Sequence, residues 1–164
     1  GVSNVVYSNN NIVTGQENKL GATGANYFNN AVFGYQNTVL GTNTVVGGAG
    51  NKLLNNANGS FIAGTNNTID SGFSNFAAGD GNYIYGPAFP NRSFNFVMGR
   101  YNILGSTTKK IVGATASGYY LNLTNDYSTA FGKFNANYSN AIFEVGSGNN
   151  ATALNSALAI ATIG

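Results

Sequence analysis

Residues 60 to 84 read Ser60-Phe-Ile-Ala-Gly64-Thr-Asn-Asn67-Thr-Ile69-Asp-Ser-Gly72-Phe-Ser-Asn75-Phe-Ala-Ala-Gly79-Asp-Gly-Asn82-Tyr-Ile84. It holds two copies of the template Ser/Asn-x-Φ-x-Gly-x-x-Asn-x-Φ, in which Φ is an apolar residue. Repetition at a short period is typical of proteins in which a small unit stacks on copies of itself, because one unit cannot bury its apolar face alone. The sequence therefore predicts a repeat protein.

The same template extends along the chain in both directions. Its second half, Gly-x-x-Asn-x-Φ, occurs at Gly15/Asn18/Leu20, Gly34/Asn37/Val39, Gly48/Asn51/Leu53, Gly64/Asn67/Ile69, Gly79/Asn82/Ile84 and Gly99/Asn102/Leu104. The spacing between successive unit glycines is 14 from Gly34 to Gly48, then 16, 15, 20 and 33, and it is 14 again from Gly132 to Gly146. These spacings predict that the stacking unit is a coil of about 14 residues, with insertions in the middle of the chain.

Each coil is predicted to contain two short strands joined by turns. Period-2 alternation places Val32, Ile62, Ala77, Val97 and Ala130 on one face. Glycine supplies the positive φ that tight turns require, and asparagine tolerates the left-handed region, so the unit Gly and Asn residues are expected to form the turns. Equivalent asparagines can also form amide ladders from coil to coil. The predicted fold is all-β, a parallel β-roll or β-solenoid.

So thin a coil leaves about five to seven residues per side and room for one or two inward side chains. Phe, Tyr, Val and Ile nevertheless recur throughout a chain in which only 7% of residues are charged. Left exposed, they would form apolar patches beyond the few hundred Å² that monomers usually tolerate. The sequence therefore predicts an obligate assembly in which several copies pack side by side.

Charge and composition argue against several classes of function. Seven basic and five acidic residues are scattered along the chain, so no basic patch indicates nucleic acid or anionic lipid. No apolar run approaches the roughly 20 residues of a membrane helix, and membrane insertion is not expected. His and Cys are absent, and with them the usual general base, metal ligand and thiol nucleophile. We therefore expect no enzyme, no cofactor and no metal site.

Two acidic patterns bear on this expectation. Asp70 and Asp80 lie near one coil apart, and a glycosidase such as a capsule depolymerase needs two carboxylates at a defined separation. Asp80-Gly-Asn82 is similar to part of a calcium loop, but the further acidic ligands of such a loop are missing. A structural turn is the preferred interpretation of Asp80-Gly-Asn82, and two carboxylates alone give the glycosidase hypothesis little support.

Longer segments of the chain resemble a known family. The segments are Asn37-Thr-Val-Leu-Gly41, Asn43-Thr-Val-Val-Gly-Gly48, Asn67-Thr-Ile-Asp-Ser-Gly72, Ser93-Phe-Asn-Phe-Val-Met-Gly-Arg-Tyr-Asn102, and Ala141-Ile-Phe-Glu-Val-Gly-Ser-Gly-Asn149 with Asn155-Ser-Ala-Leu-Ala-Ile160. They are similar to the head repeats of trimeric autotransporter adhesins of the YadA type and, more closely, to related repeats of phage tail fibres.

This resemblance implies a left-handed parallel β-roll whose three copies share one axis. It also implies an extracellular location, on a virion surface fibre or a bacterial cell surface, with a host-surface receptor, preferentially a glycan, as partner. The chain would then divide into head repeats at 1–127, interrupted at 85–93 and 105–127, and last coils with a C-terminal connecting segment at 128–164. The segment after Ala141 resembles phage fibre ends more than autotransporter necks.

The two interruptions hold the candidate receptor contacts. Residues 85–93 contain both prolines of the chain, which cannot continue a sheet ladder, together with Tyr85, Phe89 and Arg92. Residues 105–127 contain the pairs Lys109-Lys110 and Tyr119-Tyr120, which could together stack on and hydrogen-bond a glycan. The alternatives are a plug against a neighbouring subunit for the first interruption, and a hairpin with Ile111, Val112, Tyr120 and Leu121 in its core for the second.

Four functions remain open from the sequence. The first is an attachment module whose loops bind a host receptor, and the second is a fibre spacer without binding activity. The third is an ice-binding solenoid, which the irregular 14, 15, 16 and 20 spacings disfavour because such a face needs evenly spaced Thr. The fourth, a capsule depolymerase, depends on few carboxylates. The attachment module is the preferred hypothesis.

Overall fold

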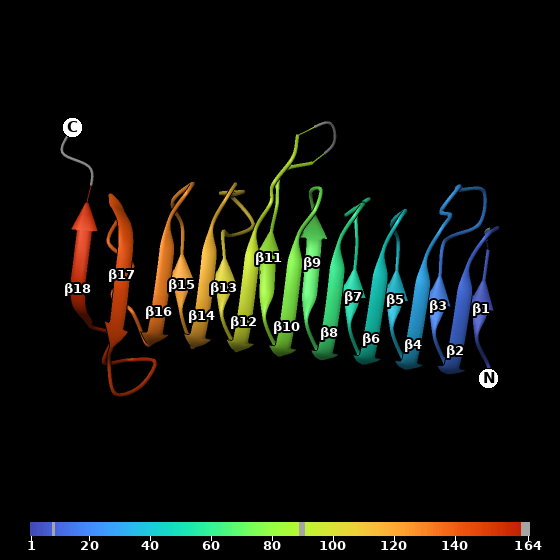
Figure 1. Cartoon of the computed structure of the whole chain (residues 1–164), viewed down its shortest axis with the longest axis horizontal. Helices are drawn as coiled ribbons and strands as arrows, with labels where there is room; N and C mark the ends of the chain where they lie inside the picture. Colours follow the sequence, from blue (N-terminus) through green and yellow to red (C-terminus); the bar gives the residue numbers. More distant parts are fainter. Residues whose placement is uncertain (8, 89–90, 162–164) are drawn as a thin grey trace.

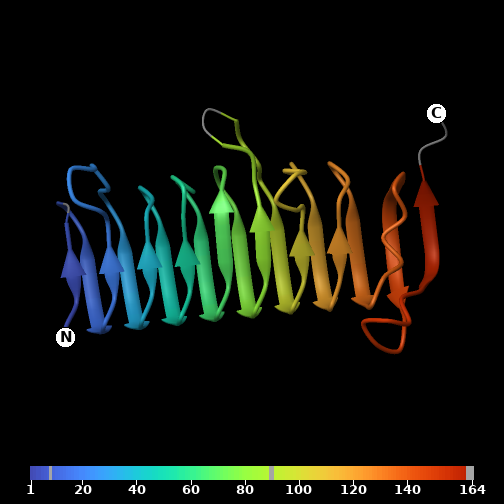
Figure 2. The ribbon, with the colours of Figure 1, turned by 180° about the vertical axis from the view of Figure 1, so that it is seen from behind.

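The computed structural model describes residues 1–7, 9–88 and 91–161, and this part of the chain contains strands and turns but no helix. The chain winds into a row of stacked coils that runs from the N-terminus at one end to the C-terminus at the other (Figure 1, Figure 2). The predicted all-β solenoid of parallel strands is confirmed. No helix of the length and apolarity that a membrane crossing requires occurs among the described residues.

Each regular coil contributes one long and one short strand to two separate sheets. The long strands are β2 (Ile12–Gln16), β4 (Ala31–Tyr35), β6 (Val45–Ala49), β8 (Phe61–Thr65), β10 (Phe76–Asp80), β12 (Phe96–Arg100), β14 (Thr115–Tyr119), β16 (Thr129–Lys133), β17 (Ala141–Ser147) and β18 (Ser156–Ala161). The short strands are β1 (Val5–Val6), β3 (Lys19–Leu20), β5 (Thr38–Val39), β7 (Lys52–Leu53), β9 (Thr68–Ser71), β11 (Tyr83–Tyr85), β13 (Ile103–Leu104) and β15 (Asn122–Leu123). The strands pair in parallel, except that β18 pairs antiparallel with β17.

The core lies between the two sheets. In β4 to β16 the second residue of each long strand belongs to the same core cluster as the last apolar residue of the short strands, as Val32 and Val39 do, and both are fully buried. The residues that alternation places on one face are confirmed as core, since Val32, Ile62, Ala77, Val97 and Ala130 are all 0% exposed. A coil this thin encloses a single layer of side chains.

The unit asparagines form a buried amide ladder. The Asn51 Nδ2 donates to Oδ1 of Asn37 at 3.1 Å and to the carbonyl oxygens of Gly47 and Gly64 at 3.0 and 2.8 Å. Its Oδ1 accepts the backbone N–H of Asn67 at 3.0 Å. The ladder runs through Asn4, Asn18, Asn37, Asn51, Asn67, Asn82 and Asn102. The prediction of an amide ladder is confirmed.

The expected turn role of the unit asparagines is wrong. The residue that adopts the left-handed backbone conformation is the one before each unit Asn, with φ of 54° at Gln36 and at Asn66. Asn37 and Asn67 themselves are buried in the core. The unit glycine stands inside the long strand, where Gly48 has φ of +111° and a Cβ would overlap the carbonyl oxygen of Gly64. Glycine is therefore required there by close approach of the coils as well as by backbone conformation.

The connections between strands are constant in length at one edge of these coils and vary in length at the other. At the edge where the long strands end, called the lower edge because it is lower in Figure 1, two residues join each of β2, β4, β6, β8, β10, β12 and β14 to the following short strand. At the opposite, upper edge the connections range from four residues (72–75) to ten. The ten-residue connections are 21–30, 86–95 and 105–114. Additions to these coils therefore occur at one edge.

This finding corrects the predicted interruption at 105–127. Its first ten residues are an upper-edge connection, but β14 and β15 then form a regular coil, in which Gly118 pairs in register with Gly99 and Gly132. Leu121 occupies the ladder position in place of Asn, which hid this coil from the sequence template. The hairpin interpretation is also wrong. Ile111 and Leu121 are buried, but Tyr120 is 38% exposed.

The C-terminal coil contains a buried carboxylate. Glu144 lies in β17 opposite Ala130, at a position that holds Val, Ile or Ala in the preceding coils, and is 1% exposed. Its Oε2 accepts the backbone N–H of Asn137 at 3.0 Å and the Ser156 hydroxyl at 2.6 Å. Its Oε1 accepts the backbone N–H of Tyr138 at 3.2 Å. Glu144 therefore ties the 134–140 connection and the start of β18 to the core.

Candidate binding surfaces

The upper edge gathers the three long connections on one side of a rigid scaffold (Figure 1). Additions in repeat proteins map to loops on one face, which is often the binding face. Loops on a rigid framework also carry function more often than the framework itself. The upper edge is therefore the first candidate surface, and it contains four of the six sequence-predicted contacts that the structure describes.

Tyr85 and Lys110 are brought together by the fold. The Lys110 Nζ lies 4.9 Å from the centroid of the Tyr85 ring and 2.8 Å from Oδ2 of Asp70. The Tyr85 ring stacks on Tyr83 with centroids 4.1 Å apart. Burial, and then the negative charge of Asp70, raise the pKa of Tyr83 to about 12. Because Lys110 is already paired with Asp70, this cluster secures the bases of two neighbouring connections and leaves little free charge for a ligand.

The remaining upper-edge candidates are separate from that cluster. Arg92 is exposed, with its guanidinium carbon 5.9 Å from the centroid of the Phe94 ring. Lys109 is exposed, and its Nζ is 3.5 Å from Oδ1 of Asn125 in the next coil. Phe89 lies outside the described residues. Arg92 and Lys109 therefore remain on this edge as solvent-facing cations.

Tyr119 and Tyr120 lie at the opposite edge from the lysine pair, so the prediction of one combined Lys and Tyr site is wrong. The five-residue strand β14 separates them, since Lys110 precedes the strand and Tyr119 ends it. At about 3.3 Å per residue this strand spans roughly 16 Å. The tyrosine pair belongs instead to an aromatic cluster on the lower edge, with Tyr101 and Phe134.

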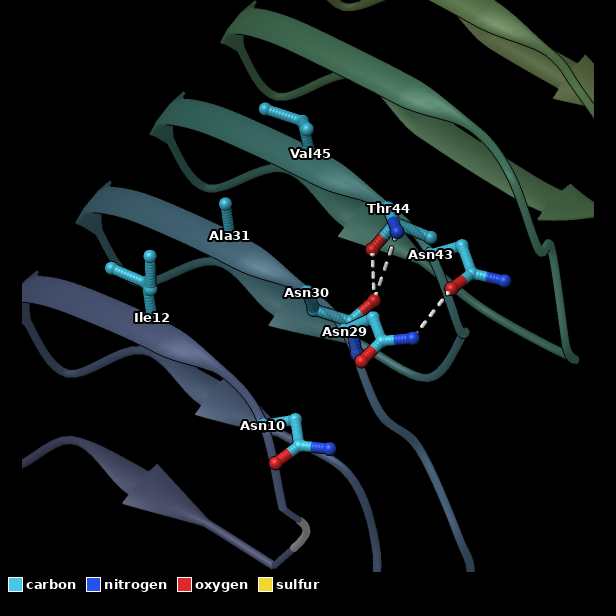
Figure 3. A pocket seen from close by; sticks show the side chains of 8 residues that line it. All are labelled: Asn10, Ile12, Asn29, Asn30, Ala31, Asn43, Thr44 and Val45. Carbon is cyan, nitrogen blue, oxygen red and sulfur yellow. Dashed lines mark hydrogen bonds between the residues drawn. The ribbon is translucent and has the colours of Figure 1, made fainter.

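An open groove of about 490 Å³ lies where the first long strands begin (Figure 3). One wall is the apolar row Ile12, Ala31 and Val45, and the other is the amide row Asn10, Asn29 and Asn43. These asparagines stand one coil apart in the left-handed conformation, and the Asn29 Nδ2 donates to Oδ1 of Asn43 at 3.1 Å. An amphipathic groove of this kind can accept hydrogen-bonding ligands, although none of the described residues that line it is charged.

The acidic residues singled out from the sequence hold partners of their own. Asp70 binds Lys110 and accepts a hydrogen bond from Asn55 at 2.6 Å, while Asp80 binds Arg100 at 2.9 Å. Each of the two carboxylates forms an ion pair with a different cation, so their contacts give no support to a site in which they act together as acid and base. Within the described ranges, no three His, Cys, Asp or Glu side chains gather to hold a metal ion.

Sequence reasoning missed the outer face of the long-strand sheet as a distinct surface. The first and third residues of the long strands β2 to β16 point outward, in register with Phe143 and Val145 of β17, and none of these positions holds a charged residue. The signal was present in the template, whose two x positions before the glycine are filled by Phe, Ala, Val, Met, Thr, Ser, Ile and Gly. Only the parallel register places these residues in two continuous rows.

Comparison with known proteins adds no assignment. No family model, no curated protein and no solved structure matches this chain.

Proposed function

We propose that this protein is a module of an adhesive fibre, in which three copies pack along a common axis and hold ligand-binding surfaces away from a virion or a cell. The observation that carries the proposal is the pair of uncharged rows at the first and third positions of the long strands, which include a run of stacked aromatic rings. The left-handed sense of the coil and the trimer follow from the sequence resemblance to tail fibre and adhesin head repeats.

The first-position row of this face is continuous. Stacked rings run from Phe61 to Phe76 to Phe96, with centroids 5.2 and 4.7 Å apart and planes within 8° of parallel. In the single chain Phe61 remains 39% and Phe96 36% exposed. The third-position row adds Phe33, Met98 and Phe131, each 40 to 42% exposed. Burial of such rings between copies would remove a large apolar area from water.

The opposite face of the solenoid has a different character. The outward row of the short strands begins with Lys19, Thr38, Lys52 and Thr68 in register and continues with Tyr83 and Ile103. Lysines thus occupy this row in the first coils, whereas the first and third positions of the long strands hold none. Lysine on an outward sheet position favours contact with solvent over contact with another chain. In the proposed trimer, each chain therefore turns its long-strand sheet toward the common axis and its short-strand sheet toward solvent.

A second copy of the chain is the partner that fits the long-strand face best. Nine parallel strands at about 4.8 Å span roughly 38 Å, and a strand of five residues is about 16 Å wide. The resulting face, on the order of 600 Å², is at the upper limit of the apolar patches that monomers expose. A parallel copy has the same spacing between coils, so its side-chain rows match this face coil by coil over the whole length.

Thiol protection tests which face is buried. The chain has no cysteine, so a single Cys can be placed on either face. In the proposed trimer, a maleimide labels Ala78→Cys on the long-strand face much more slowly than Thr38→Cys on the short-strand face. Both positions are half-buried in the single chain, which makes them a matched pair. Equal labelling of the two folded variants would contradict the proposed packing.

Binding separates an adhesive module from a fibre spacer. Deletion of residues 86–92 removes most of one upper-edge connection and keeps the strands on either side. Under the adhesive proposal this variant remains trimeric and binds host cells less well than the parent. If binding by the parent is absent, or is unchanged in the deletion variant, the segment acts as a spacer.

A further inference from the structure

The residue type at the lower-edge corner changes to aromatic in the last coils. Its left-handed corner position holds Gln36, Gly50, Asn66 and Gly81 in successive coils, and then Tyr101, Tyr120 and Phe134. Glycine and asparagine suit a positive φ, whereas bulky residues adopt it rarely. Three consecutive coils nevertheless place aromatic side chains there, with φ of 56°, 54° and 48°. The aromatic residues are therefore not explained by backbone preference at this corner.

These rings form one cluster with Tyr119. The Tyr120 ring lies 5.1 Å from Tyr101 and stacks on Phe134 with centroids 5.3 Å apart and planes at 17°. Tyr119 contacts Tyr120 edge-on at 4.9 Å. Phe134 is 7% exposed and forms the floor, while Tyr119 and Tyr120 are 37% and 38% exposed. The cluster thus presents two phenol rings to solvent on a rigid apolar base.

Cationic side chains border the exposed rings on both sides. Arg100 and Lys133 are the in-register neighbours of Tyr119 in the adjacent strands. The Arg100 Nε binds Oδ2 of Asp80 at 2.9 Å, and its Nη2 donates to the Tyr101 hydroxyl at 3.0 Å. Lys133 is exposed and has no ion pair among the described residues. Lys133 can therefore pair with a ligand, while Arg100 is held in place by Asp80 and Tyr101.

We propose that Tyr119, Tyr120 and Lys133 form a binding site for an anionic saccharide. An aromatic ring offers an apolar face to the C–H side of a sugar ring, and the tyrosine hydroxyl supplies a polar tip for its hydroxyl groups. Lys133 pairs with the carboxylate or sulfate of the sugar as a point charge. This inference deepens the adhesive function proposed above by naming a ligand class and an edge, and it rests on that function.

Titration calorimetry of the whole chain tests the site with three probes. These are a heparin-derived hexasaccharide for sulfate, a galacturonic acid hexamer for carboxylate, and lactose as a neutral sugar. We expect one or both anionic probes to bind, with affinity that falls as salt is raised, and lactose to bind at least tenfold more weakly. Absence of binding by both anionic probes, or equal binding of lactose, would overturn the proposal.

Variants then assign the binding to the lower edge. Tyr120→Asn places at the corner the residue that Asn66 provides naturally, so the fold should persist. We expect Tyr120→Asn and Lys133→Ala each to weaken the anionic probe at least tenfold. The control is Tyr35→Thr, which removes an exposed tyrosine from the same strand position as Tyr119, in a coil without the cluster. Equal losses in Tyr35→Thr, or no loss in Tyr120→Asn, would overturn the site.

The oligomeric state of the same samples separates this inference from the function that it rests on. A trimer that binds none of the probes contradicts the saccharide site and leaves the fibre proposal standing. A monomer contradicts the fibre proposal, whether or not the probes bind.

Discussion

The Oδ1 atom of Asn37 accepts two hydrogen bonds from Asn51 in the next coil, from the backbone nitrogen at 3.0 Å and from Nδ2 at 3.1 Å. Both residues are fully buried. In this way one side chain satisfies a backbone donor at the corner of the neighbouring coil, just before its short strand begins. Repeated along the solenoid, the contact joins the coils through their interior.

Asn51→Ala should be strongly destabilising. It leaves the backbone N–H of Asn67 and the carbonyl of Gly64 without their buried partners, at about 1 to 3 kcal/mol each. We expect the free energy of unfolding to fall by about 3 kcal/mol or more in urea titration. Asn66→Gly, at the exposed corner that Gly50 and Gly81 occupy in other coils, should change it by less than about 1 kcal/mol. Similar losses in both variants would contradict the structural role of the ladder.

Two adjacent glycines should respond oppositely to alanine. A Cβ on Gly48 meets the backbone of Gly64 at a φ of +111°, whereas a Cβ on Gly47 meets no atom within 4 Å. Gly48→Ala should therefore cost at least about 3 kcal/mol or prevent folding. Gly47→Ala, on the outward position that Ala63 and Ala78 occupy elsewhere, should be neutral or stabilising by up to about 1 kcal/mol. Thermal unfolding monitored by circular dichroism measures both.

Glu144→Gln should destabilise the C-terminal coil. The carboxylate accepts hydrogen bonds on both oxygens, and an amide offers only one acceptor atom. One donor is then left without a partner, at a cost of about 1 to 3 kcal/mol. The same change at the exposed Glu17 should remain within about 0.5 kcal/mol. Faster amide hydrogen exchange in β17 and β18 of Glu144→Gln alone would support this role, and unchanged exchange would argue against it.

Alkaline unfolding should depend on Tyr83. Because its folded-state pKa is raised to about 12, above the ordinary value of 10.0, the folded state holds this proton more tightly than the unfolded state. The resulting stability is fully present below pH 10 and is lost as the pH rises toward 12. Between pH 10 and 12, Tyr83→Phe should therefore lose less stability than the parent. Parallel urea midpoints across this range would contradict the shift.

The strands and the core were predictable from the sequence because both depend on local alternation. Val32 and Ile62 are buried for the reason that the template gives, namely period 2 between a polar corner and a glycine. The amide ladder was predictable for the same reason, since a residue repeated at one coil position must stack on itself. Both features can be predicted from the template residues alone, without the rest of the coil.

Features that depend on the corners were not predictable from the template. Leu121 is buried at the ladder position and contributes an apolar side chain instead of an amide. The coil at Gly118 therefore lacks the Asn by which the template identifies the other coils. The left-handed corner at Gln36 or Tyr101 carries no residue preference strong enough to identify it from sequence. The lower-edge cluster joins Tyr101 to Tyr120 and Phe134, each of which directly follows a different long strand, so only the coil register brings them together.

The molar mass of the protein in solution tests the central claim most directly. One chain has a mass of 17.0 kDa, so the proposed trimer has three times that mass. Sedimentation equilibrium at micromolar concentration should give the trimer mass, and Phe76→Lys, which places a charge in the middle of the stacked rings, should lower it. A parent protein that sediments at 17.0 kDa would contradict the account.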